Sequence, residues 1–298
     1  MNSLMKSFDE LFPPTKLTIK KDEIGGLESV MTQLNKFQYG IAHKDMYKFM
    51  GVSPPNGVIF YGPSGYGKTY LAKYLAGNLE ARFVDLPLNM FESKWVGESE
   101  KKLGQYLDAC RLYHDLTGDK VLVFMDEAEE AMKDRRLEGW HGPRVNLLLR
   151  YMDGFEKNEG IIFGAATNYL DKVDPAFLRS GRLDFRIEVK DYDAYQMADV
   201  VRATMTRINR SAKPHSPVVL DSDGMLFLGK KIKEYNLTPA DVSECFRRAG
   251  EEKIIEMIEY KEQILPESIY HIYKDDLWRQ MPLLQRKNTD KVVGFKPR

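Results

Sequence analysis

Between residues 58 and 189, short runs of β-branched and aromatic residues alternate with longer segments of helical periodicity. Strands separated by helices in this way are typical of a parallel sheet with helices on both faces. Such an open α/β sheet binds its ligands outside the carboxyl ends of its strands. The helical segment after Gly97 has an apolar stripe that we expect to face the sheet, at Leu103, Leu107 and Cys110. The predicted strands are Val58–Tyr61, Arg82–Leu86, Val121–Met125, Ile161–Ala165 and Phe185–Val189.

Beyond Asp191 the strand pattern stops and helical periodicity takes over, which predicts a second, all-helical domain. The stretch from Thr238 to Asp241 has the residues of a helix start, with Thr as N-cap and Pro in the first turn. The predicted helices of this part are Tyr192–Asn209, Ser222–Tyr235 and Pro239–Gln263. We expect four parts: a loose N-terminal arm (1–20), an α/β domain (21–190), a helical domain (191–281) and a C-terminal tail (282–298).

Composition indicates an ordinary globular protein. The 298 residues suit about two domains. Charged residues make up 30%, with 44 basic against 44 acidic, which excludes a disordered acidic chain and a basic nucleic-acid coat. No apolar run reaches the 18 or so residues of a membrane span, and the N-terminus lacks the apolar region of a signal peptide, so we expect a cytoplasmic protein. Cys110 and Cys245 are interpreted as buried or free thiols.

The segment Gly62–Thr69 fits the phosphate-loop pattern G-x-x-x-x-G-K-[ST], and it lies between a predicted strand and a predicted helix. Its glycines let backbone N–H groups turn toward a phosphate, and the helix N-terminus adds its dipole. Lys68 would neutralise the β- and γ-phosphate oxygens, and Thr69 would offer its hydroxyl to Mg²⁺. The expected cofactors are therefore ATP and Mg²⁺. The candidate nucleotide-binding residues here are Pro63, Ser64, Gly65, Tyr66, Gly67, Lys68, Thr69 and Tyr70.

The strand Val121–Met125 ends in two carboxylates, Asp126 and Glu127. By itself this is also what a buried strand followed by a helix N-terminus gives. Beside a phosphate loop, Asp126 would hold Mg²⁺ and Glu127 would polarise the attacking water.

With these residues the chain resembles AAA-type ATPases, in the narrower AAA family of protein-remodelling motors, over roughly residues 20 to 281. The resemblance implies a P-loop α/β module with a small helical lid. It implies that Ile24 and Gly25, within Asp22–Leu27, line the adenine pocket. It also implies that Asn168, at the end of Ile161–Asn168, positions the hydrolytic water as the first sensor.

The segment Val173–Arg182 resembles the second region of homology of that family. The resemblance implies that Arg179 and Arg182 are arginine fingers, supplied in trans to the ATP of a neighbouring subunit, and hence that the active unit is a ring, usually a hexamer. A guanidinium fork stabilises the charge on the transferring phosphoryl group. Surface arginines in intrachain ion pairs are the alternative.

The segment Ser93–Glu100 resembles the central pore loop in its katanin-like and spastin-like form, with Lys94, Trp95 and Val96 gripping an extended polypeptide. Burial of Trp95 in the core is the alternative. A second loop, Lys133–Arg144, contains Trp140 and His141; it either lines the pore too or is simply solvated.

The chain departs from the family pattern in three segments. Ser64 and Tyr66 replace the common Pro and Thr, and Leu183-Asp184-Phe185-Arg186 displaces the third arginine of the second region. In the lid, Pro239 replaces the usual Gly. None of these changes removes a catalytic group.

The leading hypothesis is an ATP-driven motor that remodels a polypeptide substrate, with the client chosen by a separate adaptor, the arm or the ring face. An ATP-dependent loader or DNA-associated motor is the alternative, although zero net charge and no basic DNA-binding motif make nucleic acid an improbable partner. The third hypothesis is a nucleotide-gated scaffold with little turnover. The presence of both Asp126 and Glu127 disfavours it.

Overall fold

The computed structural model describes residues 19–87, 98–132, 142–153, 160–212, 217–259 and 271–292. These residues form two compact units. The sheet unit comprises Ile19, Ser29–Ser64 and Lys68–Val189, and the helical unit comprises Lys20–Glu28, Gly65–Gly67 and the chain from Lys190 onward. Two short segments that we placed in the α/β domain therefore pack with the helices instead. The predicted arm up to residue 18, the pore-loop residues Lys94, Trp95 and Val96, and residues 133–141 of the second loop lie outside the described residues.

The sheet has the strand order β2-β3-β4-β1-β5, and all of its pairs are parallel. The five predicted strands are confirmed, with ends that shift by one or two residues. Strand β1 lies between β4 and β5, with Ile59 opposite Ala165 on one side and Arg186 on the other. The strands are β1 Gly57–Tyr61, β2 Ala81–Asp85, β3 Lys120–Met125, β4 Ile161–Thr167 and β5 Phe185–Glu188.

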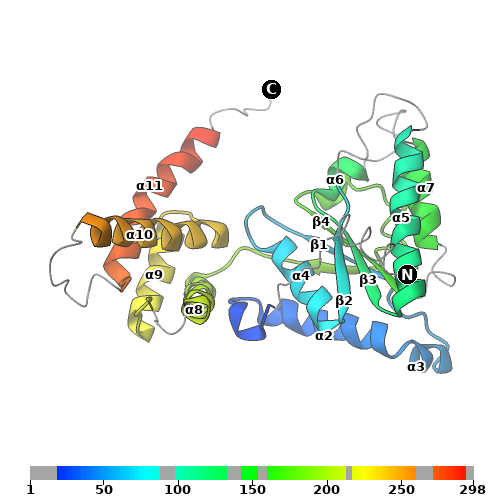
Figure 1. Ribbon diagram of the computed structural model, residues 1–298, viewed down its shortest axis with the longest axis horizontal. Coiled ribbons are helices and arrows are strands. Elements are labelled where there is room, and N and C mark those ends of the chain that lie inside the picture. Colours follow the sequence, from blue (N-terminus) through cyan, green and yellow to red (C-terminus); the bar gives the residue numbers. More distant parts are fainter. Residues whose placement is uncertain are drawn as a thin grey trace. The chain divides into compact units, whose positions relative to one another are not determined.

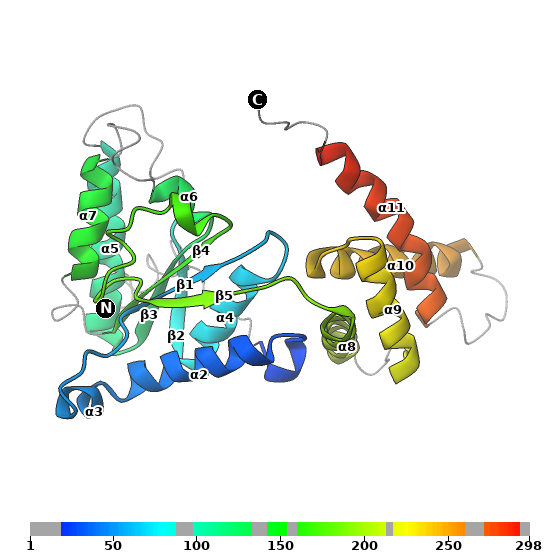
Figure 2. The same ribbon diagram turned by 180° about the vertical axis from the view of Figure 1, so that it is seen from behind.

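Helices cover both faces of this sheet (Figures 1 and 2). On one face pack α5 (Glu98–Thr117) and α7 (Gly142–Asp153), whose apolar residues share a core cluster with alternate strand residues such as Val123. The predicted stripe of Leu103, Leu107 and Cys110 is buried in that cluster. The other face carries α2 (Glu28–Ala42) and α4 (Lys68–Asn78). Short elements complete the unit: α3 Lys44–Phe49, α6 Ala128–Ala131 and the 3₁₀ helix η4 Leu170–Lys172.

The helical unit contains α8 (Ala194–Ser211), α9 (Ser222–Glu234), α10 (Pro239–Glu259) and α11 (Lys274–Val292), together with the 3₁₀ helix η1 (Lys21–Glu23). Asp193 caps α8, where its carboxylate accepts a hydrogen bond from the Gln196 amide at 2.8 Å. Helix α10 begins at Pro239, as its sequence indicates. Helix α11 runs through residue 282, where we expected the tail to start, even though Pro282 lies inside it. Within the part of the chain that the structure describes, no helix has the length and apolarity to cross a membrane.

Candidate nucleotide-binding site

The phosphate loop leaves the inner strand β1 and enters α4, which is the strand-loop-helix context that its motif requires. The Gly62 amide donates to the Thr167 carbonyl at 3.3 Å, so the loop starts against the end of β4. Gly62 has a φ of +142°, and a Cβ there would lie 2.0 Å from the Val189 carbonyl oxygen. Only glycine fits this first position of the loop.

Lys68 is buried under the loop, with 7% of its surface exposed. Its ammonium donates to the carbonyls of Gly62 at 2.9 Å and Pro63 at 2.8 Å, and to Oδ1 of Asn168 at 2.7 Å. Burial lowers the pKa of Lys68, while the charges of Asp126 and Glu129 act in the opposite direction. The structure thus brings together the predicted phosphate-binding lysine and the predicted sensor, which lie 100 residues apart in the sequence.

Thr69 and Asp126 also meet, because the first turn of α4 lies beside the end of β3. The Thr69 hydroxyl donates to Oδ2 of Asp126, and Oδ1 of Asp126 accepts from the Glu127 amide at 2.9 Å. A hydroxyl and a carboxylate are oxygen ligands of the kind that Mg²⁺ prefers. Among the described residues no three metal-ligating side chains gather, so Mg²⁺ would be completed by phosphate and water oxygens, as is usual for this ion.

Glu127 lies at the start of α6 in an unusual backbone conformation. Its φ of 48° and ψ of 45° place it in the left-handed region, and its side chain is exposed. Non-glycine residues in this region cost about 1–2 kcal/mol and cluster at functional sites. The exposed carboxylate is accessible to a water molecule beside bound nucleotide.

Sequence reasoning missed Glu129, which is 5% exposed. Its Oε1 accepts from the backbone amide of Asn168 at 3.3 Å, and its Oε2 has no hydrogen-bond partner in the described parts of the chain. The carboxylate therefore holds the backbone of Asn168, while Lys68 binds its side chain. The available signal was a third acid two residues after Glu127.

The two candidate finger arginines have different surroundings. Arg182 forms a bidentate ion pair with Asp153, at 2.6 and 2.7 Å, and donates to the Ala176 carbonyl at 2.5 Å. Its side chain is 16% exposed. This is the intrachain ion pair named above as the alternative. Arg179 is exposed, and no partner is found for it within the described residues.

The segment predicted to contact adenine packs on α8. Gly25 lies so close to that helix that a Cβ would be 2.2 Å from the Asp199 carbonyl oxygen. Gln196 donates to the Gly26 carbonyl at 2.9 Å, and Arg210 binds both Asp22 and Glu23. Ile24 lines a hollow of about 420 Å³ in the helical unit, with Arg202 and Thr206 among its other walls. The structure thus fixes Ile24 and Gly25 to the helices; their role toward adenine stays a prediction.

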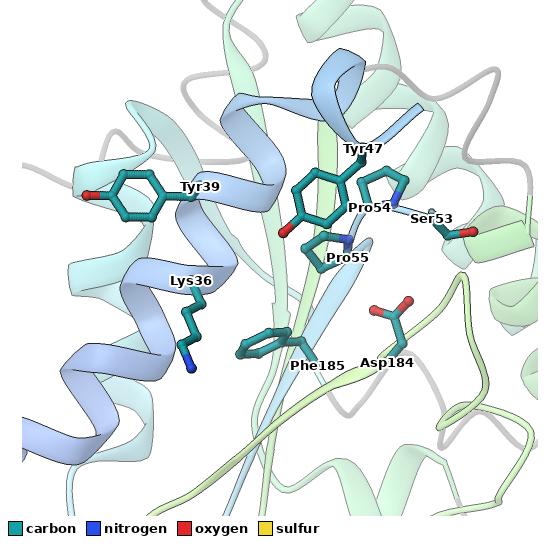
Figure 3. A pocket seen from close by; sticks show the side chains of 8 residues that line it. All are labelled: Lys36, Tyr39, Tyr47, Ser53, Pro54, Pro55, Asp184 and Phe185. Carbon is teal, nitrogen blue, oxygen red and sulfur yellow. The ribbon is translucent and has the colours of Figure 1, made fainter. Parts of the chain in front are cut away.

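A separate hollow of about 520 Å³ opens at the other end of the sheet, where β1 and β5 begin (Figure 3). Its walls are largely aromatic and proline side chains, including Tyr39, Tyr47 and Pro55. Asp184 lines it too, but its carboxylate accepts from the amides of Asn56 at 3.1 Å and Gly181 at 2.9 Å. Lys36 is the one cationic side chain among its lining residues, and the hollow lies at the opposite end of the strands from the phosphate loop.

The parallel sheet and this loop define a P-loop nucleotide-binding α/β fold. Residues 58–191 match the model of the AAA family, the ATPase family associated with various cellular activities. The matched segment runs from β1 past the end of β5 and so covers most of the sheet unit. The match supports ATP-driven activity in general terms. The katanin-like and spastin-like form of the pore loop stays a prediction.

Proposed function

We propose that this protein is an ATP-hydrolysing ring motor that remodels, unfolds or disassembles protein substrates by pulling polypeptide through a central pore. The main support for ATP hydrolysis is a pair of side-chain hydrogen bonds, from Lys68 to Asn168 and from Thr69 to Asp126. Lys68 and Thr69 begin α4, while Asp126 and Asn168 directly follow β3 and β4, at the edge where an open parallel sheet binds its ligands.

Each of these residues has a distinct role in the proposed hydrolysis. The Lys68 ammonium, now shared by two loop carbonyls and Asn168, would bind the β- and γ-phosphate oxygens. Thr69 and Asp126 would hold Mg²⁺, which when bound neutralises charge on the phosphates. Glu127 would orient the attacking water and accept its proton, and Asn168 would fix that water near the γ-phosphate.

The proposal of a ring is based on Arg179. An exposed guanidinium without an intrachain partner among the described residues is available to the nucleotide of a neighbouring subunit. Such a finger contributes about 10³ to 10⁵ in rate. Arg182 is already held by Asp153, so we assign the trans contact to Arg179 and a role in shaping the segment to Arg182. The assignment of a polypeptide as substrate is based only on the sequence of Lys94, Trp95 and Val96.

The decisive experiment is ATPase rate per subunit against protein concentration, alone and with an unfolded polypeptide or single-stranded DNA. We expect a cooperative rise with concentration and stimulation by the polypeptide. A rate that does not change with concentration would contradict the shared active site. Stimulation by DNA that weakens steeply with salt would favour the loader alternative instead.

A further inference from the structure

We propose that Tyr66, Asp191 and Lys233 form a clasp that holds the tip of the phosphate loop in the shape that receives nucleotide, with Tyr66 as a positioning residue. The proposal rests on the nucleotide site described above and adds a determinant of its affinity. The tip, Gly65–Gly67, belongs to the helical unit, whereas Ser64 and Lys68 on either side of it belong to the sheet unit.

The clasp is a continuous chain of hydrogen bonds. The Tyr66 hydroxyl donates to Oδ1 of Asp191 at 2.6 Å. The Lys233 ammonium, on α9, donates to the same Oδ1 at 2.9 Å and to Oδ2 at 2.8 Å. Asp191 lies in the connection between β5 and α8, so its carboxylate joins the loop tip to two parts of the helical unit.

Packing restrains the same tip independently of the clasp. Tyr66 is 8% exposed, and its ring meets that of Tyr192 edge-on with centroids 5.2 Å apart. The Gly65 carbonyl accepts from the Ala240 amide at 3.1 Å, at the start of α10. A Cβ on Gly65 would lie 2.8 Å from the Thr238 hydroxyl oxygen. The tip therefore has little freedom to rearrange without breaking contacts to the helices.

Charge strengthens the clasp. The hydrogen bonds from Lys233 and Tyr66 lower the pKa of Asp191, so its carboxylate is ionised at neutral pH. Burial and the bond to Asp191 raise the pKa of Tyr66, so its phenol keeps the proton that it donates. A neutral hydroxyl on an ionised acceptor makes one of the stronger hydrogen bonds in proteins. The Thr common at this position in similar proteins is too short to place a hydroxyl where the Tyr66 phenol ends.

The consequence concerns affinity. Backbone N–H groups of the tip must converge on a phosphate, and a loop already held in that arrangement loses less conformational entropy on binding. Loss of the clasp should therefore weaken nucleotide binding, while the groups that act on the γ-phosphate stay in place. This separation of binding from chemistry distinguishes a positioning role from general destabilisation.

The test is calorimetric titration of the full chain with MgADP, together with the kcat and KM of ATP hydrolysis. Tyr66→Phe removes the hydroxyl and keeps the ring, and we expect it to weaken MgADP binding about five- to twentyfold, with kcat changed less than twofold. Lys233→Met should have a similar effect, and Lys233→Arg should restore most of the affinity. Because both act through Asp191, the double variant should lose little more than the larger single loss.

Lys231→Met is the matched control, since Lys231 lies on the same helix but pairs with Glu234 at 2.6 Å. It should bind MgADP like the wild type. Wild-type affinity in both Tyr66→Phe and Lys233→Met would overturn the clasp, as would a lower melting temperature with unchanged affinity. A wild-type chain that binds no nucleotide would instead refute the proposed function.

Discussion

At the scale of single residues, Glu127 combines a catalytic assignment with a strained backbone. Glycine adopts the left-handed φ and ψ of this position without strain, whereas a residue with a Cβ does so at an energetic cost. A carboxylate is retained there at a cost in stability. Residues under such strain commonly lie where function requires a particular side chain, which agrees with the proposed role of Glu127 beside the attacking water.

Two substitutions separate chemistry from strain at this position. Glu127→Gln should keep nucleotide binding and abolish hydrolysis, because the amide cannot accept the proton of the attacking water. Glu127→Gly should be equally inactive yet about 1 kcal/mol more stable than Glu127→Gln, since glycine relieves the backbone strain. Phosphate release and urea unfolding of both variants provide the measurements. Rapid turnover in Glu127→Gln would contradict the assignment.

The Asp153–Arg182 ion pair should make the stability of the folded state depend on pH. Arg182 lowers the pKa of Asp153, so the pair stabilises the folded state above the ordinary Asp pKa of about 3.9 and loses that contribution as pH falls through the lowered value. Asp153 is half exposed, so the contribution is small. Asp153→Asn should cost at most about 1 kcal/mol at pH 7 and progressively less as pH falls through the lowered pKa of Asp153, by urea unfolding at each pH. A constant difference across this range would exclude the ion pair as the cause.

Much of the nucleotide site could be predicted residue by residue, because phosphate chemistry restricts which side chains follow a strand. Lys68, Thr69, Asp126 and Asn168 lie where their spacing from predicted strands indicated. The partners of the site could not be predicted. Nothing local relates Tyr66 to Asp191, 125 residues away in the sequence, and such a contact exists only once the chain has folded.

At the scale of elements, buried strands were the easiest to predict, since all seven residues of β4 are buried and its sequence has no polar side chain before Thr167. Helix α2 was missed, although Val30, Leu34, Phe37 and Ile41 form an apolar stripe at helical spacing. Helix α11 was not predicted, and the basic residues of the last 17 positions were interpreted as a terminal tail.

The contact between η1, the following glycines and α8 makes a prediction at this scale. Gly25→Ala would force its methyl group into the backbone of α8, so the 20–28 segment must move away from the helix. We expect a loss of about 1–3 kcal/mol in unfolding free energy and weaker binding of MgADP.

Gly77→Ala is the control for that substitution. Gly77 lies near the end of α4, in open space that an added methyl group would enter without contact, so the change should be neutral or stabilise by up to about 1 kcal/mol. Thermal unfolding of both variants compares them directly. Equal stability of Gly25→Ala and wild type would show that the segment does not need its close approach to α8.

At the scale of the whole molecule, the proposal is that active sites are shared between copies of the chain. Arg179→Ala should fold normally, because this side chain has no intrachain partner in the described structure, but should inactivate the site of its neighbour. In mixtures of Arg179→Ala with the inactive Glu127→Gln, ATPase activity should reappear, because a site that keeps Glu127 can then receive Arg179 from its neighbour. Two variants that stay inactive when mixed would argue against action in trans.

The strand order also has a mechanical meaning. If residues 88–97 grip a polypeptide, the reaction force enters the sheet through β2, which is an edge strand with β3 as its single neighbour. The phosphate loop, by contrast, is anchored to β1, which two ladders hold. Tension on the substrate would thus reach an edge strand first, while β1, which leads into the phosphate loop, has a neighbour on both sides. Under an opposing load, we expect β2 to separate from the sheet before β1 does. The protein would then release its polypeptide substrate before it released its nucleotide.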